Sequence, residues 1–81
     1  GAPRAGETPR LPDWFYELTP RERTIARALL RGKTNKEIAA EMHLGEQTVR
    51  NYVSTLYDKL GVDDRRGAIG ILRSIDPCWY E

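Results

Sequence analysis

Residues 34–60 constrain the fold of this 81-residue chain more than any other segment. They begin with Thr34 and, three residues later, Glu37, a capping box typical of a helix start. The residues His43-Leu44-Gly45 then predict a tight turn, and a longer helix follows from about Glu46 to Leu60. Its apolar side chains repeat at helical spacing: Val49, Val53, Leu56 and Leu60. A short helix, a turn and a longer helix form a helix-turn-helix, whose second helix fits the major groove of DNA.

One further helix is predicted on each side of this unit. The first begins at Thr19, since Thr19-Pro20-Arg21-Glu22 combines a capping threonine, a proline at the first helical position and a glutamate three residues after the cap. It ends at Gly32. The last begins at Asp63 or Asp64 and ends before Pro77. Without strand-like alternation or internal repeats, the sequence predicts an all-α fold, a four-helix bundle with a central helix-turn-helix. Outside the Val49 stripe, its expected core residues are Ile25, Ala26, Leu29, Leu30, Ile38, Ala39, Met42, Ala68, Ile69 and Leu72.

The two ends of the chain differ in composition from its middle. Residues 1–13 hold Pro3, Pro9 and Pro12 and few apolar side chains, which predicts a flexible tail or interdomain linker. The start at Gly1-Ala2 indicates a cloning remnant and a fragment of a longer protein. The folded domain is expected at 14–76, with a C-terminal tail at 77–81 for which no role is assigned. The aromatic run 14–16 is expected to cover the core; a docking patch for a missing domain is the alternative.

Composition excludes several classes of function. The chain has a single cysteine, Cys78, which rules out an internal disulfide. With a single histidine, His43, besides, a zinc site formed by this chain alone is not expected. No cofactor is expected. The sequence shows no nucleophile–base pair and no phosphate-cradling glycine loop, so an enzyme is not predicted. No apolar run approaches the roughly 18 residues of a membrane span, and no secretory signal is visible. We therefore expect a cytoplasmic domain without membrane contact.

The charge pattern gives modest support for nucleic-acid binding. The net charge is only +1. Between residues 21 and 36, however, Glu22 is the single acid, and a local basic patch can bind phosphate even when the whole domain is near neutral. The cations of this stretch are Arg21, Arg23, Arg27, Arg31, Lys33 and Lys36. A solvated helix face explains the same pattern, and both interpretations stay open.

Residues 18–72 resemble the LuxR/NarL-type (GerE-like) DNA-binding domain of bacterial transcription regulators. Four separate segments carry the resemblance, in the expected order and spacing. They are Leu18-Thr19-Pro20-Arg21-Glu22-Arg23, Gly32-Lys33-Thr34-Asn35-Lys36-Glu37-Ile38-Ala39, Thr48-Val49-Arg50-Asn51-Tyr52-Val53 and Lys59-Leu60-Gly61-Val62.

The resemblance implies a four-helix domain that regulates transcription by binding double-stranded DNA as a homodimer. The third helix would enter the major groove, and the fourth would pair across the dimer axis. Such domains are the C-terminal effector parts of larger regulators. A response regulator of a two-component system is the expected type, with its N-terminal regulatory domain outside this chain and RNA polymerase as a further partner.

The resemblance also assigns site residues by position. The expected base-contacting residues are Gln47, Arg50, Asn51 and Ser54. The expected DNA-backbone contacts are Thr34, Asn35, Lys36, Thr48, Tyr52 and Lys59. The candidate dimer contacts are Arg66, Ile69, Gly70 and Arg73. The residue types suit these tasks, because arginine can donate two hydrogen bonds to a guanine edge and glutamine or asparagine can pair with adenine.

The sequence departs from the family pattern at a few positions. Gly45 replaces the common serine cap, and Tyr52 stands where histidine is frequent. Gly67 and Gly70 weaken the last helix and leave dimer strength in question. Two alternatives stay open: a helix-turn-helix that binds another protein, and a polymerase sigma-factor region 4, which shares this core.

Overall fold

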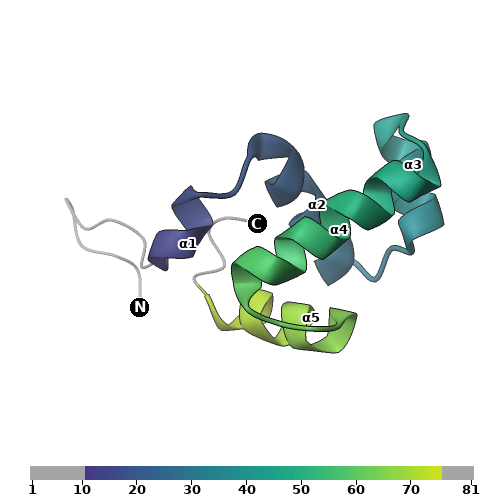
Figure 1. The fold of residues 1–81 in the computed structure, drawn as a ribbon. Coiled ribbons are helices and arrows are strands. Elements are labelled where there is room, and N and C mark those ends of the chain that lie inside the picture. The colour runs from purple at the N-terminus through teal and green to yellow at the C-terminus, as the bar shows by residue number, and fades with distance from the viewer. Residues whose placement is uncertain (1–10, 76–81) are drawn as a thin grey trace, which may run out of the picture.

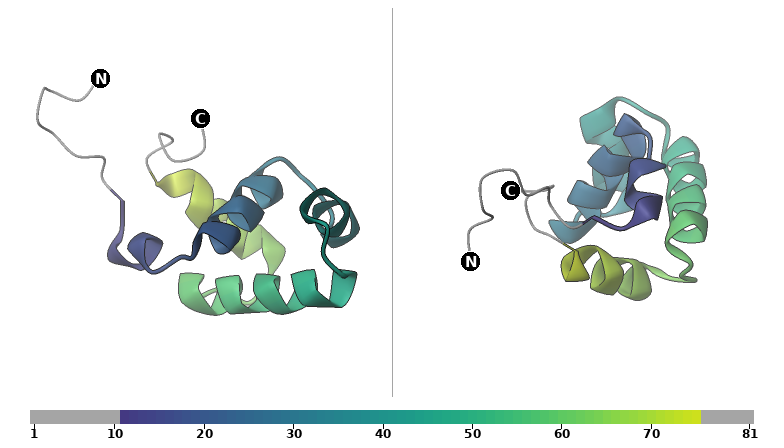
Figure 2. Two further views of the ribbon diagram at one scale, coloured as in Figure 1. Left: turned by 90° about the horizontal axis from the view of Figure 1, so that it is seen from above. Right: turned by 90° about the vertical axis from the view of Figure 1, so that its left-hand side faces the viewer.

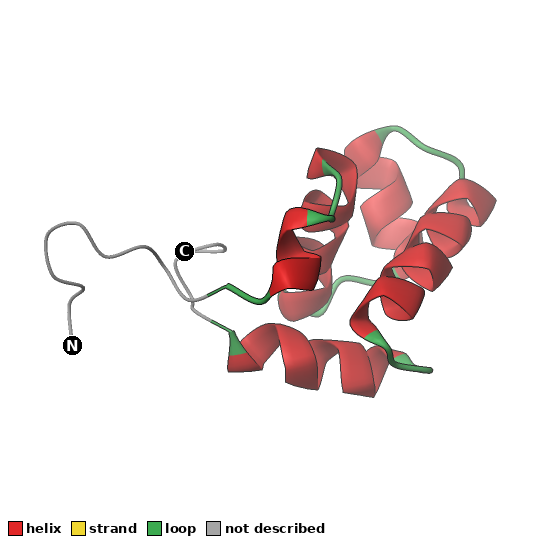
Figure 3. Ribbon diagram, turned by 60° about the vertical axis from the view of Figure 1, so that its left-hand side comes forward, coloured by secondary structure: helices red, strands yellow, loops and turns green. Residues whose placement is uncertain are grey.

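The computed structural model describes residues 11–75, which form five helices connected by short loops (Figure 1). The helices are α1 (Asp13–Tyr16), α2 (Pro20–Leu30), α3 (Asn35–Met42), α4 (Glu46–Leu60) and α5 (Arg65–Ser74). This part of the chain contains no strand (Figure 3). The predicted all-α class and the four predicted helices are therefore confirmed, and α1 is an additional element.

Capping boxes fix the starts of α2 and α3, as the sequence predicts. The hydroxyl of Thr19 accepts from the amide of Glu22 at 3.1 Å, and Glu22 Oε1 accepts from the amide of Thr19 at 2.8 Å. Thr34 and Glu37 form the same pair of bonds at 3.1 and 2.9 Å. Each box satisfies two amides that a helix N-terminus leaves without intrahelical partners.

The ends of α3 and α4 use left-handed residues. His43 adopts φ 55° at the end of α3, an unusual conformation for a residue other than glycine, and it turns the chain toward α4. Gly61 ends α4 with φ 72°. The side chain of Asp64 accepts from the amide of Gly67 at 2.8 Å and caps α5. The predicted bounds of α4 and the predicted start of α5 are thus confirmed.

The core lies between α2, α3, α4 and α5. Figures 1 and 2 show α4 crossing the body of the domain, with α3 at its N-terminal end and α5 running beside its C-terminal half. The buried apolar residues are Phe15, Leu18, Ile25, Ala26, Leu29, Ile38, Ala39, Val49, Val53, Leu56, Leu60, Ala68 and Leu72. Leu30, Met42 and Ile69, also expected in the core, are half-buried at its edge.

Helix α1 adds the aromatic residues 14–16 to the domain. Phe15 is buried in the core, Trp14 is half-buried, and Tyr16 is 60% exposed. The guanidinium carbon of Arg23 lies 4.8 Å from the centre of the Phe15 ring, so α1 is held against α2. The expected cover over the core is therefore provided mainly by Phe15. The linker expected at the N-terminus lies mostly outside the described residues, and the tail with Cys78, Trp79 and Tyr80 lies wholly outside them.

Two further structural findings bear on function. Within residues 11–75, no helix combines the length and apolarity that a bilayer span requires. In the same region, histidine, cysteine and acidic side chains form no group of three that could hold a metal ion.

Candidate nucleic-acid interface

One face of α4 presents a row of exposed polar side chains. Gln47, Arg50, Asn51 and Ser54 are all exposed, at the spacing that places residues on one side of a helix. The opposite side carries Val49, Val53, Leu56 and Leu60, which are buried. Because the apolar face anchors α4 across most of its length, the polar row stands on a rigid element and faces solvent.

Bonds along the helix hold this polar row in place. The amide nitrogen of Gln47 donates to the side-chain oxygen of Asn51 at 3.1 Å. Arg50 lies 3.5 Å from a carboxylate oxygen of Glu46, one turn earlier. Such exposed contacts contribute only a few tenths of a kcal/mol, so base edges can replace them at little cost.

The polar residues at the start of α3 form a second part of the interface. Thr34 and Lys36 are exposed and Asn35 is half-buried. The hydroxyl of Thr34 accepts from the amide of Glu37 and caps the helix. Thr48, in the first turn of α4, is also exposed. These side chains can donate to phosphate oxygens, which is the kind of contact that fixes the position of a protein on DNA.

Tyr52 lies between the polar row of α4 and the start of α2. It is half-buried, and its hydroxyl accepts a hydrogen bond from Arg21 at 3.2 Å. The Arg21 guanidinium carbon is also 5.6 Å from the centre of the Tyr52 ring. Tyr52 is thus fixed by a cation from another helix.

Lys59 has a structural partner inside the domain. Its ammonium lies 2.7 Å from Glu22 Oε1 and donates to the carbonyl of Glu17 at 3.2 Å. The Glu22 side chain is only 3% exposed. Burial by itself would raise the pKa of Glu22, but the bonds from Lys59 and from the Thr19 amide outweigh it, and the pKa is lowered. In this structure the ammonium of Lys59 is directed toward Glu22 and Glu17, which gives Lys59 a role in the fold and not the expected position on the DNA backbone.

The cations between residues 21 and 36 do not form one surface. Arg23 packs on Phe15, and Lys33 lies 3.8 Å from a carboxylate oxygen of Glu41. Arg27 is half-buried, whereas Arg21 and Lys36 are exposed. The stretch therefore includes cations that contact other parts of the fold and cations that face solvent, and for the exposed ones both interpretations stay open.

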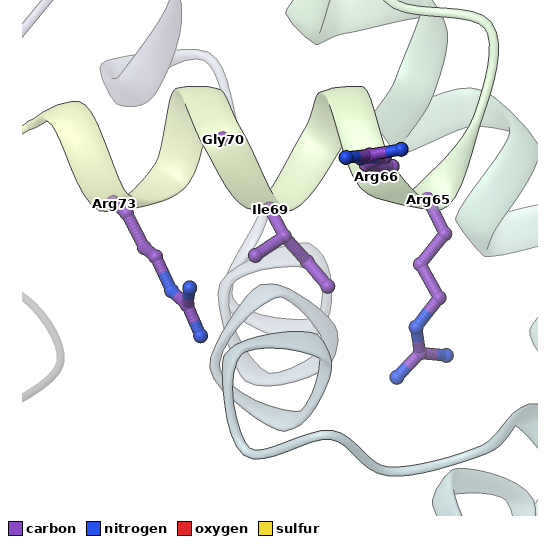
Figure 4. A pocket seen from close by; sticks show the side chains of 5 residues that line it. All are labelled: Arg65, Arg66, Ile69, Gly70 and Arg73. Atoms are coloured by element: carbon purple, nitrogen blue, oxygen red, sulfur yellow. The ribbon is translucent and has the colours of Figure 1, made fainter.

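The face of α5 predicted to form the dimer contact borders a shallow groove of about 570 Å³. Its lining residues are Arg65, Arg66, Ile69, Gly70 and Arg73 (Figure 4). The structure thus brings all four candidate dimer residues to one place. Figure 4 shows Ile69 and Arg73 extending in the same direction from the helix. The face combines an apolar centre with cationic ends.

Sequence reasoning missed the contributions of Arg21 and Glu22 to this arrangement. The sequence places Arg21 in a basic stretch and Glu22 in a capping box, and both belong to the first family segment, but none of these patterns indicates their partners. Their partners, Tyr52 and Lys59, are 31 and 37 residues away in the chain. Local periodicity carries no information on pairs so far apart in the chain. The one available hint of the Glu22–Lys59 pair was that each residue lies in one of the family segments.

Comparisons with known proteins agree with this geometry. Residues 16–72 match the family model described as bacterial regulatory proteins, luxR family. The spore germination protein GerE of Bacillus subtilis is 48% identical over 52 residues, covering 64% of this chain and 70% of the relative. The DNA-binding transcriptional activator DevR/DosR of Mycobacterium tuberculosis is 53% identical over 51 residues, covering 63% of this chain and 24% of the relative.

A third relative matches a longer part of this chain. The transcriptional regulatory protein DesR of Bacillus subtilis is 41% identical over 64 residues, covering 79% of this chain and 31% of the relative. The chain spans only about a quarter to a third of the length of relatives such as DevR/DosR and DesR. The family match covers more than half of this chain and includes α2 to α4 and most of α5. The chain therefore belongs to the luxR family of bacterial regulatory proteins.

Proposed function

We propose that this chain is the DNA-binding domain of a bacterial transcription regulator and that α4 reads DNA sequence in the major groove. The exposed polar row of α4 carries the proposal. Its residues Gln47, Arg50, Asn51 and Ser54 project from a helix whose other face is buried, and their side chains match the donors and acceptors of base edges. Thr34, Asn35, Lys36, Thr48 and Tyr52 would position the domain on the DNA backbone.

We further propose that the domain acts as the C-terminal effector part of a longer regulator. The support is that the matched region makes up only a quarter to a third of relatives such as DevR/DosR and DesR. On DNA, two copies would pair through α5, where Arg66, Ile69, Gly70 and Arg73 line one groove. RNA polymerase and an N-terminal regulatory domain would be the protein partners, and the protein would act in the cytoplasm.

In-vitro selection from a random duplex library, followed by fluorescence anisotropy with the selected duplex, tests DNA recognition. Wild type should prefer the selected duplex over a scrambled one. Arg50→Ala should cost about 1–3 kcal/mol on the selected duplex and relax the preference at one base position. Because Arg50 is exposed and its one ion pair within residues 11–75 is with Glu46, the variant should fold normally.

Lys36→Ala is the matched comparison within the interface. It removes a cation that is expected to touch only phosphate, so it should weaken binding equally on both duplexes. If selection yields no preferred duplex and wild type shows no salt-dependent binding, the helix-turn-helix is a protein-interaction module and the proposal fails.

A further inference from the structure

Arg21 is an exposed cation at the first turn of α2 that contacts the recognition helix. It reaches across to α4 and donates from Nη1 to the hydroxyl of Tyr52 at 3.2 Å. Its guanidinium also lies over the Tyr52 ring. Two contacts to the same ring restrict a long side chain that would otherwise be free to move in solvent.

The charge of Arg21 is not neutralised within the described part of the domain. Lys33, Arg50 and Lys59 each have a carboxylate within 4 Å, whereas no carboxylate in residues 11–75 lies that close to Arg21. The guanidinium has five N–H donors, and Tyr52 accepts from one of them. Several donors and a full positive charge therefore remain available for an anion.

Tyr52 supplies a second donor at the same point. Its hydroxyl accepts from Arg21, so the hydroxyl hydrogen is directed elsewhere. No acceptor for this hydrogen lies within bonding distance among the described residues. A group with two acceptor oxygens could take one bond from Arg21 and one from Tyr52.

The space beside this pair is an open groove between α2 and α4. A groove of about 520 Å³ is lined by Thr19, Pro20, Arg21, Thr24, Met42 and Tyr52. Tyr52 also lines a second groove of about 280 Å³, with Thr48, Asn51 and Thr55. Tyr52 thus connects the α2–α4 groove to residues of the proposed interface.

We propose that Arg21 and Tyr52 form a phosphate-binding site and that its ligand is a single phosphodiester of the DNA backbone. Arg21 bonds one non-bridging oxygen with a charge-assisted hydrogen bond, and the Tyr52 hydroxyl donates to the other. The inference rests on the proposed DNA binding and adds a backbone contact from α2. It also explains how tyrosine functions where the family often has histidine: Tyr52 both positions Arg21 and binds the phosphate.

The salt dependence of binding tests this site. Each neutralised phosphate contributes a slope of about −0.9 to a plot of log K against log salt concentration. Arg21→Ala should therefore make the slope shallower by about 0.9, by the same amount on selected and scrambled duplexes. A roughly fourfold rise in salt should then weaken wild-type binding about 3.5 times more than it weakens binding by the variant.

Three comparisons make the result specific. Arg31→Ala removes the same charge from the other end of α2. If Arg31→Ala changes the salt slope as much as Arg21→Ala does, the change reflects net charge and the proposed phosphate site is refuted. Tyr52→Phe should weaken binding without changing the slope, because it removes a donor and no charge. The double variant Arg21→Ala/Tyr52→Phe should lose less affinity than the two single losses combined, since both groups bind one phosphate; additive losses would contradict a shared ligand.

The same measurements separate this inference from DNA binding in general. Steep salt dependence in wild type, unchanged in Arg21→Ala, would refute the site while leaving DNA recognition intact. Absence of any binding by wild type would refute both. Inorganic phosphate, added at constant ionic strength, should not displace the duplex; selective displacement from wild type but not from Arg21→Ala would make this a site for free phosphate and overturn the assignment to DNA.

Discussion

The carboxylate of Glu22 is buried at the junction of α2 and α4, where two groups donate to the same oxygen. These are the ammonium of Lys59 at 2.7 Å and the amide of Thr19 at 2.8 Å. One side chain therefore caps α2 and connects its first turn to the last turn of α4. A second bond from Lys59, to the carbonyl of Glu17, adds the loop before α2 to this connection.

Replacing Lys59 should destabilise the fold before it affects any DNA contact. Lys59→Ala leaves the Glu22 carboxylate buried without its cation, and breaking such a pair costs about 3 kcal/mol, the lower end of the usual range, since the lysine is partly exposed. Urea unfolding followed by circular dichroism measures the loss. Lys36→Ala, at an exposed lysine that forms no ion pair with the described residues, should stay within about 0.5 kcal/mol of wild type. Equal stability of the two variants would contradict the structural role of Lys59.

Acid should remove the contribution of Glu22. Its pKa is lowered in the folded state from the ordinary value of 4.5, so its stabilising effect is complete above that value and is lost as pH falls through the lower folded value. The pKa of Glu37 is lowered in the same direction by its bonds with Thr34. Urea midpoints measured across the acid range should show the difference between wild type and Glu22→Gln shrinking below about pH 4.5. A constant difference would mean that the pKa of Glu22 is the same in the folded and unfolded states, which would contradict the lowered pKa.

At the scale of the element, local sequence rules predicted the helices that carry their own start and stop signals. The capping boxes at Thr19 and Thr34 and the glycine at Gly61 determine bounds through contacts within a few residues. Helix α1 was not predicted, because four residues give no periodicity and Phe15 is fixed by packing against distant residues such as Arg23. The polar face of α4 could also be predicted, because its residues are only three or four positions apart along one helix. The side-chain pairs Arg21–Tyr52 and Glu22–Lys59 could not.

Helix α5 contains two glycines with different surroundings, and substitution should separate them. A Cβ atom at Gly70 would meet no atom within 4 Å outside the helix's own backbone, so Gly70→Ala should stabilise the domain by about 1 kcal/mol through helix propensity. At Gly67 the same atom would lie 3.2 Å from the capping carboxylate of Asp64 and 3.3 Å from Cβ of Val62. Gly67→Ala should therefore gain less than Gly70→Ala or lose stability. Thermal unfolding of the two variants measures the difference in stability. A larger gain in stability at Gly67 than at Gly70 would contradict crowding by Asp64 and Val62.

At the scale of the whole molecule, the proposed reading face and the proposed pairing face lie on different helices of one small body. The polar row belongs to α4, and the pairing face belongs to α5, which packs beside it (Figure 2). Changes on α5 can therefore alter assembly while the residues of α4 stay in place. In the proposed pairing, the charge of the α5 face would affect how readily two free copies associate, because Arg66 and Arg73 flank its apolar centre.

In an antiparallel crossing of two α5 helices at Ile69 and Gly70, Arg66 of one copy faces Arg73 of the other at both ends of the contact. Repulsion between these like charges should keep the free domain largely monomeric at low salt and let salt favour dimers. Arg66→Glu would turn both repulsive pairs into attractive ones. With about 0.5–1 kcal/mol for each exposed pair, the dimer dissociation constant should fall about tenfold.

Sedimentation equilibrium of the free domain measures this effect at low and high salt. Arg73→Glu should strengthen association as Arg66→Glu does, and the salt dependence of both variants should be opposite to that of wild type. The double variant Arg66→Glu/Arg73→Glu places glutamates opposite each other and should return to weak association. The double variant also serves as the control, because any effect of either glutamate on the stability of α5 itself is present in it as well. Tight association of the double variant would show that the two arginines do not face each other, and that the copies pair in another register or through another surface.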